Sequence, residues 1–376
     1  MPDNVKYHEW VAISDIMSML AEVKAPANIK IGGEHSVVYG GPSLSAAISL
    51  YATSTVEDLD SKALEILLPD LDRRKSFSHE ELEALHVDFD ARDKSPPIPG
   101  REGEAGIKKY VAKHAGIGME FLPYATIAAR LHFDYGARVL SRRVTVRSDV
   151  PRQSGYASSA VCSTSFAMAL VKAAGIIIGD HDAIDLIRDG ERVQHGAEGS
   201  GRIDVGPAYF GGYVEFGKEG IVPMNIKTET WFVIFDTGPK PPTSEMVGRV
   251  RELYNRDRKH TDRILKEIDE CVTSDVDALG KGDLKELGRL MSRNHELLRE
   301  LGVSSNGLDT AVSIALSNGA LGAKMCGGGG GGIGIALVND DVVADALEKV
   351  LRAAGFAAYR VELSGKGAKD LSRIKS

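Results

Sequence analysis

Glycine- and serine-rich segments carry the residues of this chain that are best suited to chemistry. Pro151–Ala160 (PRQSGYASSA) lies where an expected strand ends at Val150 and an apolar helix is expected from Ser158 to about Ala174. The free N–H groups and the positive dipole end at such a junction bind phosphate. Ser158 or Ser159 can also cap the helix, so a well-capped core helix is the structural alternative.

A second segment, Lys324–Gly332 (KMCGGGGGG), contains six consecutive glycines. It is expected to join a small-residue helix over Ser313–Ala323 to an apolar strand that begins at Ile333. Glycine permits close approach of the main chain to a ligand or another loop, so we favour a functional role over a flexible hairpin linker. A third segment, Glu34–Gly41 (EHSVVYGG), is weak alone, because a Glu-His pair before a turn is often only a hydrogen-bonded surface corner.

The elements that must position these segments alternate as in a mixed α and β protein. Alternating and apolar runs predict strands over 27–38, 43–57, 143–150, 213–216, 231–235, 333–338 and 358–363. Apolar residues at three- and four-residue spacing predict helices between 244 and 301, and another helix is expected over 342–354. Residues 57–106 predict a charged, proline-punctuated surface excursion with some helix.

The composition is typical of a globular protein. Of its 376 residues, 43% are hydrophobic and 26% charged, and this length predicts two domains, 1–220 and 221–376, with a boundary near 217–226. A net charge of −7 argues against nucleic acid as a partner, because that binding rests on phosphate neutralisation. Three scattered cysteines, and no stretch that looks like a secretory signal or a membrane span, predict a cytoplasmic protein.

Five segments resemble motifs of the GHMP kinase superfamily, and most closely those of its mevalonate kinase branch. In chain order they are APANIKIGGEHSVVYGGP (25–42), GYASSAV (155–161), GERVQHG (190–196), SRNHELLRELGVSSNGLDTAV (292–312) and KMCGGGGGG (324–332). The family counterparts of three of them are GEHAVVYG, GLGSSAA and KLTGAGGGG. The resemblance covers nearly the whole chain and keeps the order of the motifs.

The resemblance implies an α+β fold of two domains. The N-terminal domain would resemble ribosomal protein S5 domain 2 and bind ATP, the C-terminal domain would be ferredoxin-like, and the active site would lie in the cleft between them. The implied activity is ATP-dependent phosphorylation of the hydroxyl group of a small molecule, with ATP and Mg²⁺ as cofactors. For the mevalonate kinase branch this means mevalonate to 5-phosphomevalonate, in isoprenoid biosynthesis. Family members are often dimers, but the sequence does not fix the oligomeric state.

The family motifs also imply roles in nucleotide binding. The loop expected to wrap the ATP phosphates with its main-chain N–H groups consists of Gly155, Tyr156, Ala157, Ser158 and Ser159. Ser159 would also hold Mg²⁺ through its hydroxyl, with Glu191 as the carboxylate ligand, and oxygen ligands suit a hard cation. Without the surrounding motif, Glu191 would be interpreted as a solvated helix residue.

Asp204, in SGRIDVGPAYFGG, is the implied catalytic base, which accepts the alcohol proton or orients the hydroxyl. The structural alternative is an aspartate that caps a turn. Asn28 stands where the family has a lysine beside this aspartate. Lys30 lies two residues further along the same strand face and can supply the missing charge, with Arg202 as a second candidate and a solvated Lys30 as the alternative. The segment from His195 to Asp204 is longer than in the family, which leaves the substrate it faces open.

Substrate contacts are implied at six further positions. They are Asn28, Glu34, His35, Tyr39, Gly328 and Gly329. For His35, a structural histidine is the alternative. Cys326 replaces the family threonine, and a thiol is a weaker hydrogen-bond donor than a hydroxyl.

Three functions other than a mevalonate kinase stay open at this level. The altered lysine position and the longer loop are compatible with a GHMP kinase that acts on a sugar or on phosphomevalonate. Asn28 also resembles the asparagine of mevalonate diphosphate decarboxylases (APxNIAxIKYW), although GEHSVVYGG favours kinases. A ligand-binding pseudoenzyme is the third alternative, against which the retained Ser159, Glu191 and Asp204 argue.

Overall fold

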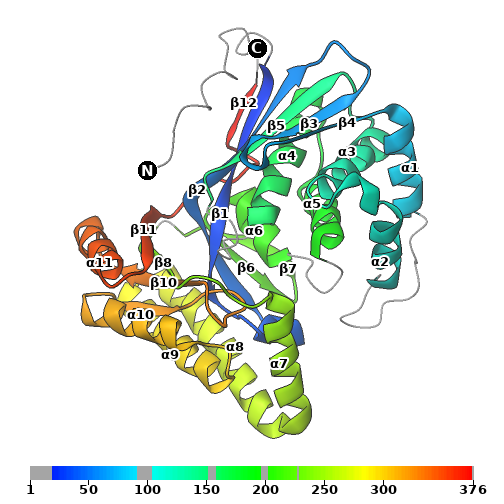
Figure 1. The fold of residues 1–376 in the computed structure, drawn as a ribbon. Coiled ribbons are helices and arrows are strands. Elements are labelled where there is room, and N and C mark those ends of the chain that lie inside the picture. The colour runs from blue at the N-terminus through cyan, green and yellow to red at the C-terminus, as the bar shows by residue number, and fades with distance from the viewer. Residues whose placement is uncertain (1–18, 91–103, 151–157, 196–201, 227, 375–376) are drawn as a thin grey trace.

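The computed structural model describes residues 19–90, 104–150, 158–195, 202–226 and 228–374, which form two β-sheets with helices packed against them (Figure 1). The first sheet contains β1 (Met19–Gly32), β2 (Ser43–Asp58), β3 (Leu64–Leu68), β4 (Arg73–Phe77), β5 (Arg142–Ser148), β6 (Tyr213–Gly217), β7 (Gly220–Met224) and β12 (Ser372–Ile374). The second contains β8 (Trp231–Asp236), β9 (Gly322–Met325), β10 (Ile333–Val338) and β11 (Ala357–Glu362).

Helices make up most of the remaining described chain. The α-helices are α1 (His79–Asp90), α2 (Glu104–Lys113), α3 (Leu122–Tyr135), α4 (Ser158–Ala174), α5 (Asp180–His195), α6 (Arg202–Phe210), α7 (Thr243–Arg256), α8 (Arg258–Lys281), α9 (Leu284–Glu300), α10 (Asn306–Ser317) and α11 (Asp341–Ala353). The short 3₁₀ helices are η2 (Ser36–Tyr39), η3 (Pro69–Leu71) and η4 (Ala115–Ile117).

The strands of the first sheet lie in the order β12-β1-β2-β5-β3-β4, and the β6–β7 hairpin pairs with the first residues of β2. The second sheet has the order β11-β8-β10-β9 and is antiparallel. Strand β12 comes after all other described strands in the chain, yet it pairs with β1 near the start. The mixed α+β architecture predicted from the sequence is confirmed.

The second half of β1 is buried on both faces. Buried and accessible residues alternate up to Lys24, and every residue from Ala25 to Gly32 is buried. Successive strand side chains point to opposite faces, so continuous burial means that both faces are covered. The covering elements include α4 and α6 from the middle of the chain and α8 and α9 from its later part. Helices from the middle of the chain and helices from its later part therefore meet at this half of β1.

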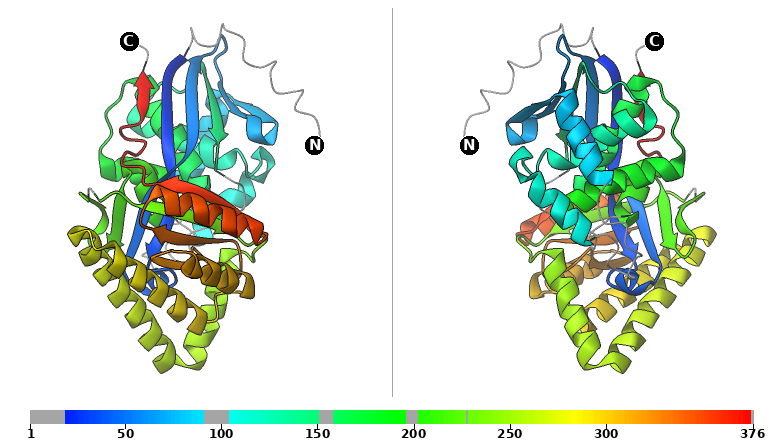
Figure 2. Two further views of the ribbon diagram at one scale, coloured as in Figure 1. Left: turned by 90° about the vertical axis from the view of Figure 1, so that its left-hand side faces the viewer. Right: turned by 90° about the vertical axis from the view of Figure 1, so that its right-hand side faces the viewer.

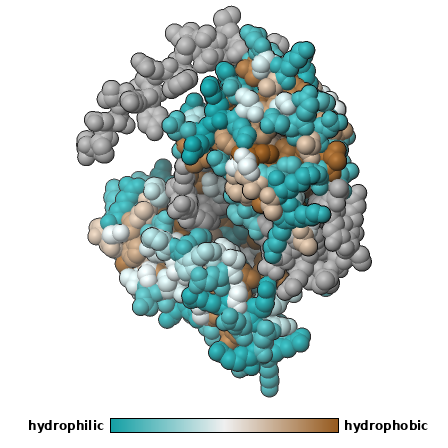
Figure 3. All heavy atoms as spheres, turned by 45° about the vertical axis from the view of Figure 1, so that its right-hand side comes forward, coloured by the Kyte–Doolittle hydropathy of each residue, from teal (hydrophilic) through white to brown (hydrophobic). Residues whose placement is uncertain are grey.

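The two sheets occupy different ends of the molecule. Figure 2 shows from two sides that α1 to α5 gather on one side of the first sheet, while the second sheet and α7 to α11 lie at the other end. On the face drawn in Figure 3, the surface is mainly hydrophilic and a recess separates the two ends. None of the helices in the described ranges has both the length and the apolar character needed to cross a lipid bilayer.

Three expectations about secondary structure are wrong, although most other expected strands and helices are confirmed. The strand expected over 27–38 ends at Gly32, and the 3₁₀ helix η2 follows at Ser36–Tyr39. Residues 57–106 were expected to form a surface excursion, but the β3–β4 hairpin extends the first sheet before α1 begins. The helix expected over 313–323 ends at Ser317, and β9 follows. Strands β3, β4 and β9 are short. Strand β3 depends on pairing with β5, which is far away in the chain, and β9 depends on packing against α9, and a local sequence pattern reveals neither. The glycine run consequently connects the two strands of a hairpin, β9 and β10.

The expected boundary between residues 220 and 221 stays a prediction. It falls at the start of β7, within the β6–β7 hairpin of the first sheet. Chain segments on both sides of it contribute to that sheet, because β12 returns to β1. The later segment also binds α6, since the Ala368 N–H donates to the Ala208 carbonyl oxygen (2.9 Å). A continuous cut at this point therefore separates strands that are hydrogen-bonded to one another.

Helix α9 crosses β9 at a contact that only glycine allows. A Cβ atom added to Gly288 would lie 2.3 Å from the Leu321 carbonyl oxygen, and one added to Gly322 would lie 1.9 Å from the Gly288 carbonyl oxygen. Real Cβ atoms do not approach backbone this closely, so a larger residue forces the helix and the strand apart. The contact fixes the distance between α9 and the strand that leads into the glycine run.

We predict that Gly288→Ala lowers the free energy of unfolding by roughly 2 kcal/mol or more, because the new methyl group overpacks a backbone contact. Gly248→Ala in α7 is the matched control: no atom lies within 4 Å of its added Cβ. It should stabilise the protein by roughly 0.5–1 kcal/mol, since alanine favours the helix. Urea unfolding of both variants measures the effect, and equal shifts would contradict the close contact.

Candidate active site

The Lys30 side chain places its ammonium group against the first turn of α6. Nζ lies 2.5 Å from Asp204 Oδ1 and donates to the Ile203 carbonyl oxygen (3.2 Å) and to the Asn28 side-chain oxygen. An ammonium group has three donors and no acceptor, so these oxygens satisfy it completely. The Lys30 side chain is 9% exposed and that of Asp204 31%. The carboxylate is therefore accessible, whereas the cation that contacts it is enclosed.

The same turn of α6 is held through its backbone. Asn28 Nδ2 donates to the Asp204 carbonyl oxygen (3.0 Å), and Ser45 Oγ donates to the Ile203 carbonyl oxygen (3.4 Å). Asn28 and Lys30 point the same way because side chains on one strand face repeat every two residues. Asp204 lies in the first turn of the helix, where the dipole favours a negative charge. Strands β1 and β2 thus fix both the main chain and the side chain of Asp204.

A second cluster of polar side chains joins α4 to α5. Ser159 Oγ donates to Glu191 Oε2 (2.8 Å) and lies 2.8 Å from His195 Nε2, while Ser163 Oγ donates to Glu191 Oε1 (3.0 Å). The two serines are four residues apart, as are Glu191 and His195, so each pair lies on one face of its helix. Glu191 is only 2% exposed. Both of its oxygens accept hydrogen bonds from hydroxyl groups.

The charge of Asp204 influences the pKa values of Glu191 and His195 in the second cluster. Burial raises the pKa of the Glu191 carboxyl to about 7, against the lowering effect of its bonds from Ser159 and Ser163, and the charge of Asp204 raises it further. Burial lowers the pKa of His195, and the charge of Asp204 opposes that shift. Asp204 is therefore close enough to influence both α5 side chains. Helix α6, which carries Asp204, also packs against α4 and α5, so the contacts of Lys30 with Asp204 and of Ser159 with Glu191 are candidates for one site.

Ser159 and Glu191 fit a divalent cation that is shared with phosphate oxygens. Mg²⁺ prefers oxygen ligands and in kinases is often bound by one or two carboxylates, with water and substrate phosphates completing its shell. A cation would also provide the positive charge that the buried Glu191 carboxylate needs. In the described ranges, no group of three or more His, Cys, Asp or Glu side chains is placed to hold a metal ion. An all-protein metal cage is thus not what these residues form.

The GGEHSVVYGG segment adopts a strained turn at His35. Its backbone has φ 64° and ψ −42°, and the Ser36 N–H donates to the Glu34 carbonyl oxygen (2.8 Å), which closes a γ-turn around His35. A γ-turn with positive φ at its centre is rare and strained, especially for a residue other than glycine. His35 Nε2 lies 3.0 Å from the Gly328 carbonyl oxygen. Burial lowers the pKa of His35, so a neutral ring that donates to this oxygen fits the contact.

The glycine run is packed between two other segments. A Cβ atom on Gly328 would lie 2.9 Å from Thr243 Cγ2, and one on Gly329 would lie 2.1 Å from the Val303 carbonyl oxygen. The Gly330 N–H donates to the same Val303 oxygen (2.8 Å). Several of these glycines have positive φ, which other residues rarely adopt. The run is a fixed, closely packed connection, and Gly328 ties it to His35.

Glu34 and Tyr39 contact residues from the C-terminal half of the chain. Glu34 is buried and pairs with the Lys324 ammonium in β9. The Tyr39 ring stacks against Tyr254 of α7, with 4.8 Å between ring centroids, and its hydroxyl group is buried. These two side chains therefore join the turn at His35 to the C-terminal helices and sheet.

Some expected site residues lie outside the described part of the chain. This applies to Gly155, Tyr156 and Ala157 and to the side chain of Arg202. Ser158 and Ser159 form the first turn of α4. The suggestion that Ser159 caps this helix is wrong, because the residue lies inside it and its hydroxyl contacts α5.

Comparisons with known proteins identify the family of this arrangement. The models "GHMP kinases N terminal domain" and "GHMP kinases C terminal" match residues 123–212 and 275–367. The mevalonate kinase of Pyrococcus furiosus is 30% identical over 359 residues, which cover 93% of this chain and 98% of that protein. The chain belongs to the mevalonate kinase family of the GHMP kinases. GHMP kinases use ATP as phosphate donor, so this family member is an ATP-dependent kinase of a small molecule.

Two further comparisons agree with this assignment to the GHMP kinases. The mevalonate kinase of Aeropyrum pernix is 27% identical over 356 residues, covering 94% of this chain and 99% of the relative. The crystal structure of the Methanococcus jannaschii mevalonate kinase has a TM-score of 0.70 and 22% identity, and it covers 91% of this chain and 98% of that one. At this identity the structural likeness shows the fold alone, and the fold is the predicted two-domain α+β fold of GHMP kinases.

Three residues of this GHMP kinase site were not predicted as site residues. Ser163 follows Ser159 by one helical turn, and His195 follows Glu191 in the same way, so the four-residue spacing was a usable signal. Lys324 gave no such signal, because its partner Glu34 lies 290 residues away in the chain. A cation at the start of a glycine-rich segment would ordinarily be expected in solvent.

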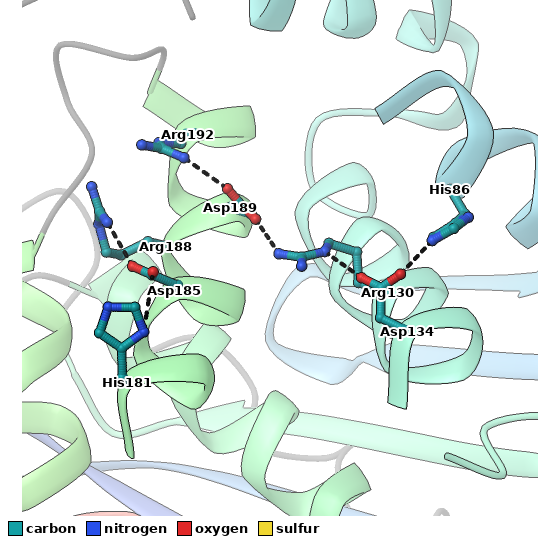
Figure 4. Close-up of polar contacts among 8 residues, drawn as sticks. All are labelled: His86, Arg130, Asp134, His181, Asp185, Arg188, Asp189 and Arg192. Atoms are coloured by element: carbon teal, nitrogen blue, oxygen red, sulfur yellow. Dashed lines mark hydrogen bonds and ion pairs between the residues drawn. The ribbon is translucent and has the colours of Figure 1, made fainter. Parts of the chain in front are cut away.

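An ion-pair network holds α5 of this kinase against α3 (Figure 4). The Asp189 carboxylate lies between Arg130 of α3 and Arg192 of α5, and Arg130 also donates to Asp134 (2.9 Å). His86 of α1 contacts the other oxygen of Asp134 (2.6 Å). Asp189 is almost fully buried. Because it lies two residues before Glu191, the network fixes the helix that carries the candidate cation ligand.

We predict that Glu191→Gln stabilises the cation-free protein at pH 8. The raised pKa means that the folded protein binds this proton more tightly than the unfolded chain, so ionisation costs stability as pH rises from about 4.5 to about 7. The cost approaches roughly 3 kcal/mol above pH 7. Glutamine carries no charge, so its advantage should be largest at pH 8.

Thermal unfolding in EDTA at pH 5 and pH 8 measures this difference. Glu286→Gln, on the exposed first turn of α9, is the control for loss of a surface carboxylate. A stabilisation by Glu191→Gln that is equal at both pH values would show that burial does not raise the pKa of this carboxyl.

Proposed function

We propose that this chain transfers the γ-phosphate of ATP to the hydroxyl group of mevalonate and forms 5-phosphomevalonate. The observation that carries the proposal is the accessible Asp204 carboxylate, held by Lys30 and Asn28 beside the Ser159–Glu191 group. The relatives named mevalonate kinase from Pyrococcus furiosus and Aeropyrum pernix, which align over nearly the whole chain, support mevalonate as the acceptor.

Asp204 is the proposed base. Its side chain is partly accessible, so an alcohol can approach it, and its carboxylate can orient the hydroxyl group or accept its proton. Lys30 keeps a positive charge beside Asp204 and beside the position where charge develops during transfer. Asn28, at the position of the family lysine, fixes the Asp204 main chain and binds the Lys30 ammonium. In this proposal two residues of β1 together perform the task of one lysine.

The start of α4 is the proposed phosphate site. Free N–H groups in the first turn of a helix bind phosphate, and Ser158 and Ser159 form that turn. Ser159 Oγ and Glu191 would hold Mg²⁺, which when bound neutralises phosphate charge during transfer. Ser163 keeps Glu191 in place through its second oxygen, and His195 does the same for Ser159.

A kinase for another alcohol is the second candidate function. Asn28 in place of the family lysine favours this candidate. The positive charge beside Asp204 comes from Lys30, which occupies a different position on β1. An acceptor of different length or charge would be compatible with this change. A sugar and phosphomevalonate are the alternatives to test.

We predict that Lys30→Met lowers kcat on the order of 10²-fold or more, because it removes the cation that contacts Asp204. Lys24→Met is the matched control: Lys24 lies on the same strand but is exposed. Its kcat should stay within about twofold of the wild type, as is usual for a surface substitution. Near-normal kcat in Lys30→Met would move the role to Arg202.

The acceptor is tested with a panel of mevalonate, phosphomevalonate and galactose in a coupled ADP assay. We expect turnover of mevalonate alone, and its loss in Asp204→Asn, which keeps the shape of the side chain but removes the base. Turnover of another alcohol without turnover of mevalonate would establish the second candidate. ADP formation that persists at the wild-type rate in Asp204→Asn would contradict the role of Asp204.

A further inference from the structure

Lys324 is a fully buried lysine at the junction between the two sheets. Its side chain is 0% exposed, its ammonium group pairs with the Glu34 carboxylate, and it donates to the Lys30 carbonyl oxygen (3.2 Å). Lys324 belongs to β9 in the second sheet, whereas Lys30 belongs to β1 in the first. A single side chain from the C-terminal half of the chain therefore reaches the backbone of the residue that contacts Asp204.

Both peptide groups of Lys30 are bound by the same segment. The Lys30 N–H donates to Cys326 Sγ (3.2 Å), and its carbonyl oxygen accepts from Lys324 Nζ (3.2 Å). In register, Lys30 faces Ser45 of β2 on one side, and β12 pairs with β1 only over Ala21 to Val23. At Lys30 the segment that starts with Lys324 thus provides the hydrogen-bond partners on the edge that β12 does not reach.

Lys324 carries an ammonium group at a fully buried position. A buried ion pair is often no more stabilising than apolar residues of similar volume, because desolvation offsets the attraction. Burial raises the pKa of Asp275 well above its usual value, although the charge of Lys324 lowers it. An apolar residue of similar volume would not donate the hydrogen bond that Lys324 gives to the Lys30 carbonyl oxygen.

We propose that Lys324 is a positioning residue for Lys30: its ammonium group, held by Glu34, fixes the main chain of Lys30 so that the side chain meets Asp204. This inference rests on the proposed function, in which the cation beside Asp204 supports phosphoryl transfer. It also assigns Glu34 a task, since its carboxylate orients Lys324. The position of β1 at Lys30, in the first sheet, would then be fixed by β9 of the second sheet.

The test is a double-mutant cycle between Lys324 and Lys30. Lys324→Met alone leaves the Glu34 charge unpaired and can impair folding, so it is always made together with Glu34→Gln, which turns the buried ion pair into a neutral pair. This paired change and Lys30→Met are made separately and together. Purified variants are compared by circular dichroism and by kcat and KM for ATP and for the accepted alcohol.

Lys324→Met combined with Glu34→Gln should lower kcat by roughly 10- to 100-fold relative to the wild type, since a small displacement of a catalytic group costs this much. KM for ATP should change by less than about threefold, because in the described part of the chain the ammonium group of Lys324 binds Glu34 and Lys30 and not the first turn of α4. When Lys30 is already methionine, the same substitution should lower kcat by less than about twofold, because residues that act through one another are not additive.

Equal losses of kcat with and without Lys30 would overturn the proposal, because an additive effect is what a purely structural residue produces. An unchanged kcat on removal of Lys324 would overturn it as well. Failure of the proposed function looks different: Lys30→Met itself would then leave kcat unaltered in the wild-type background. Glu34→Gln is also made alone. If Glu34 contacts the alcohol directly, this variant raises KM for the alcohol only.

Discussion

The contact between the Lys30 ammonium group and the first turn of α6 is the interaction on which the rest of the site depends. It joins the buried half of β1 to the helix that presents Asp204, and every donor of the ammonium group is used. An enclosed cation with a complete set of partners cannot move without breaking several bonds in a poorly solvated place. The accessible carboxylate therefore has a defined position before any substrate binds.

The surrounding structure can be understood as support for that contact from three directions. Asn28 and Ser45 hold the backbone of α6, Lys324 and Cys326 hold the backbone of Lys30, and the network around Asp189 holds α5 with Glu191. These supports come from both sheets and from helices distant in sequence. Sites that are held by surrounding side chains in this way keep the geometry that catalysis requires.

Much of the fold could be predicted from the sequence, because local patterns carry it. The buried helix α4, the amphipathic α7 to α9 and most strands follow from periodicity, and Lys30 contacts Asn28 as the two-residue period of a strand predicts. The β3–β4 hairpin, the strained turn at His35 and the pair of Lys324 with Glu34 could not be predicted. Each is tied to a segment far away in the chain, which no local pattern records: β3 pairs with β5, His35 contacts Gly328, and Glu34 pairs with Lys324. The roles of Asp204, Ser159 and Glu191 in turnover remain predictions from family motifs.

The pairing of β12 with β1 has a consequence for how the protein is made on the ribosome. Strand β1 precedes every other described strand in the chain, yet its partner on one edge, β12, is translated after all of them. An uncovered strand edge attracts other chains, so the nascent protein carries this edge of β1 exposed until β12 has been made.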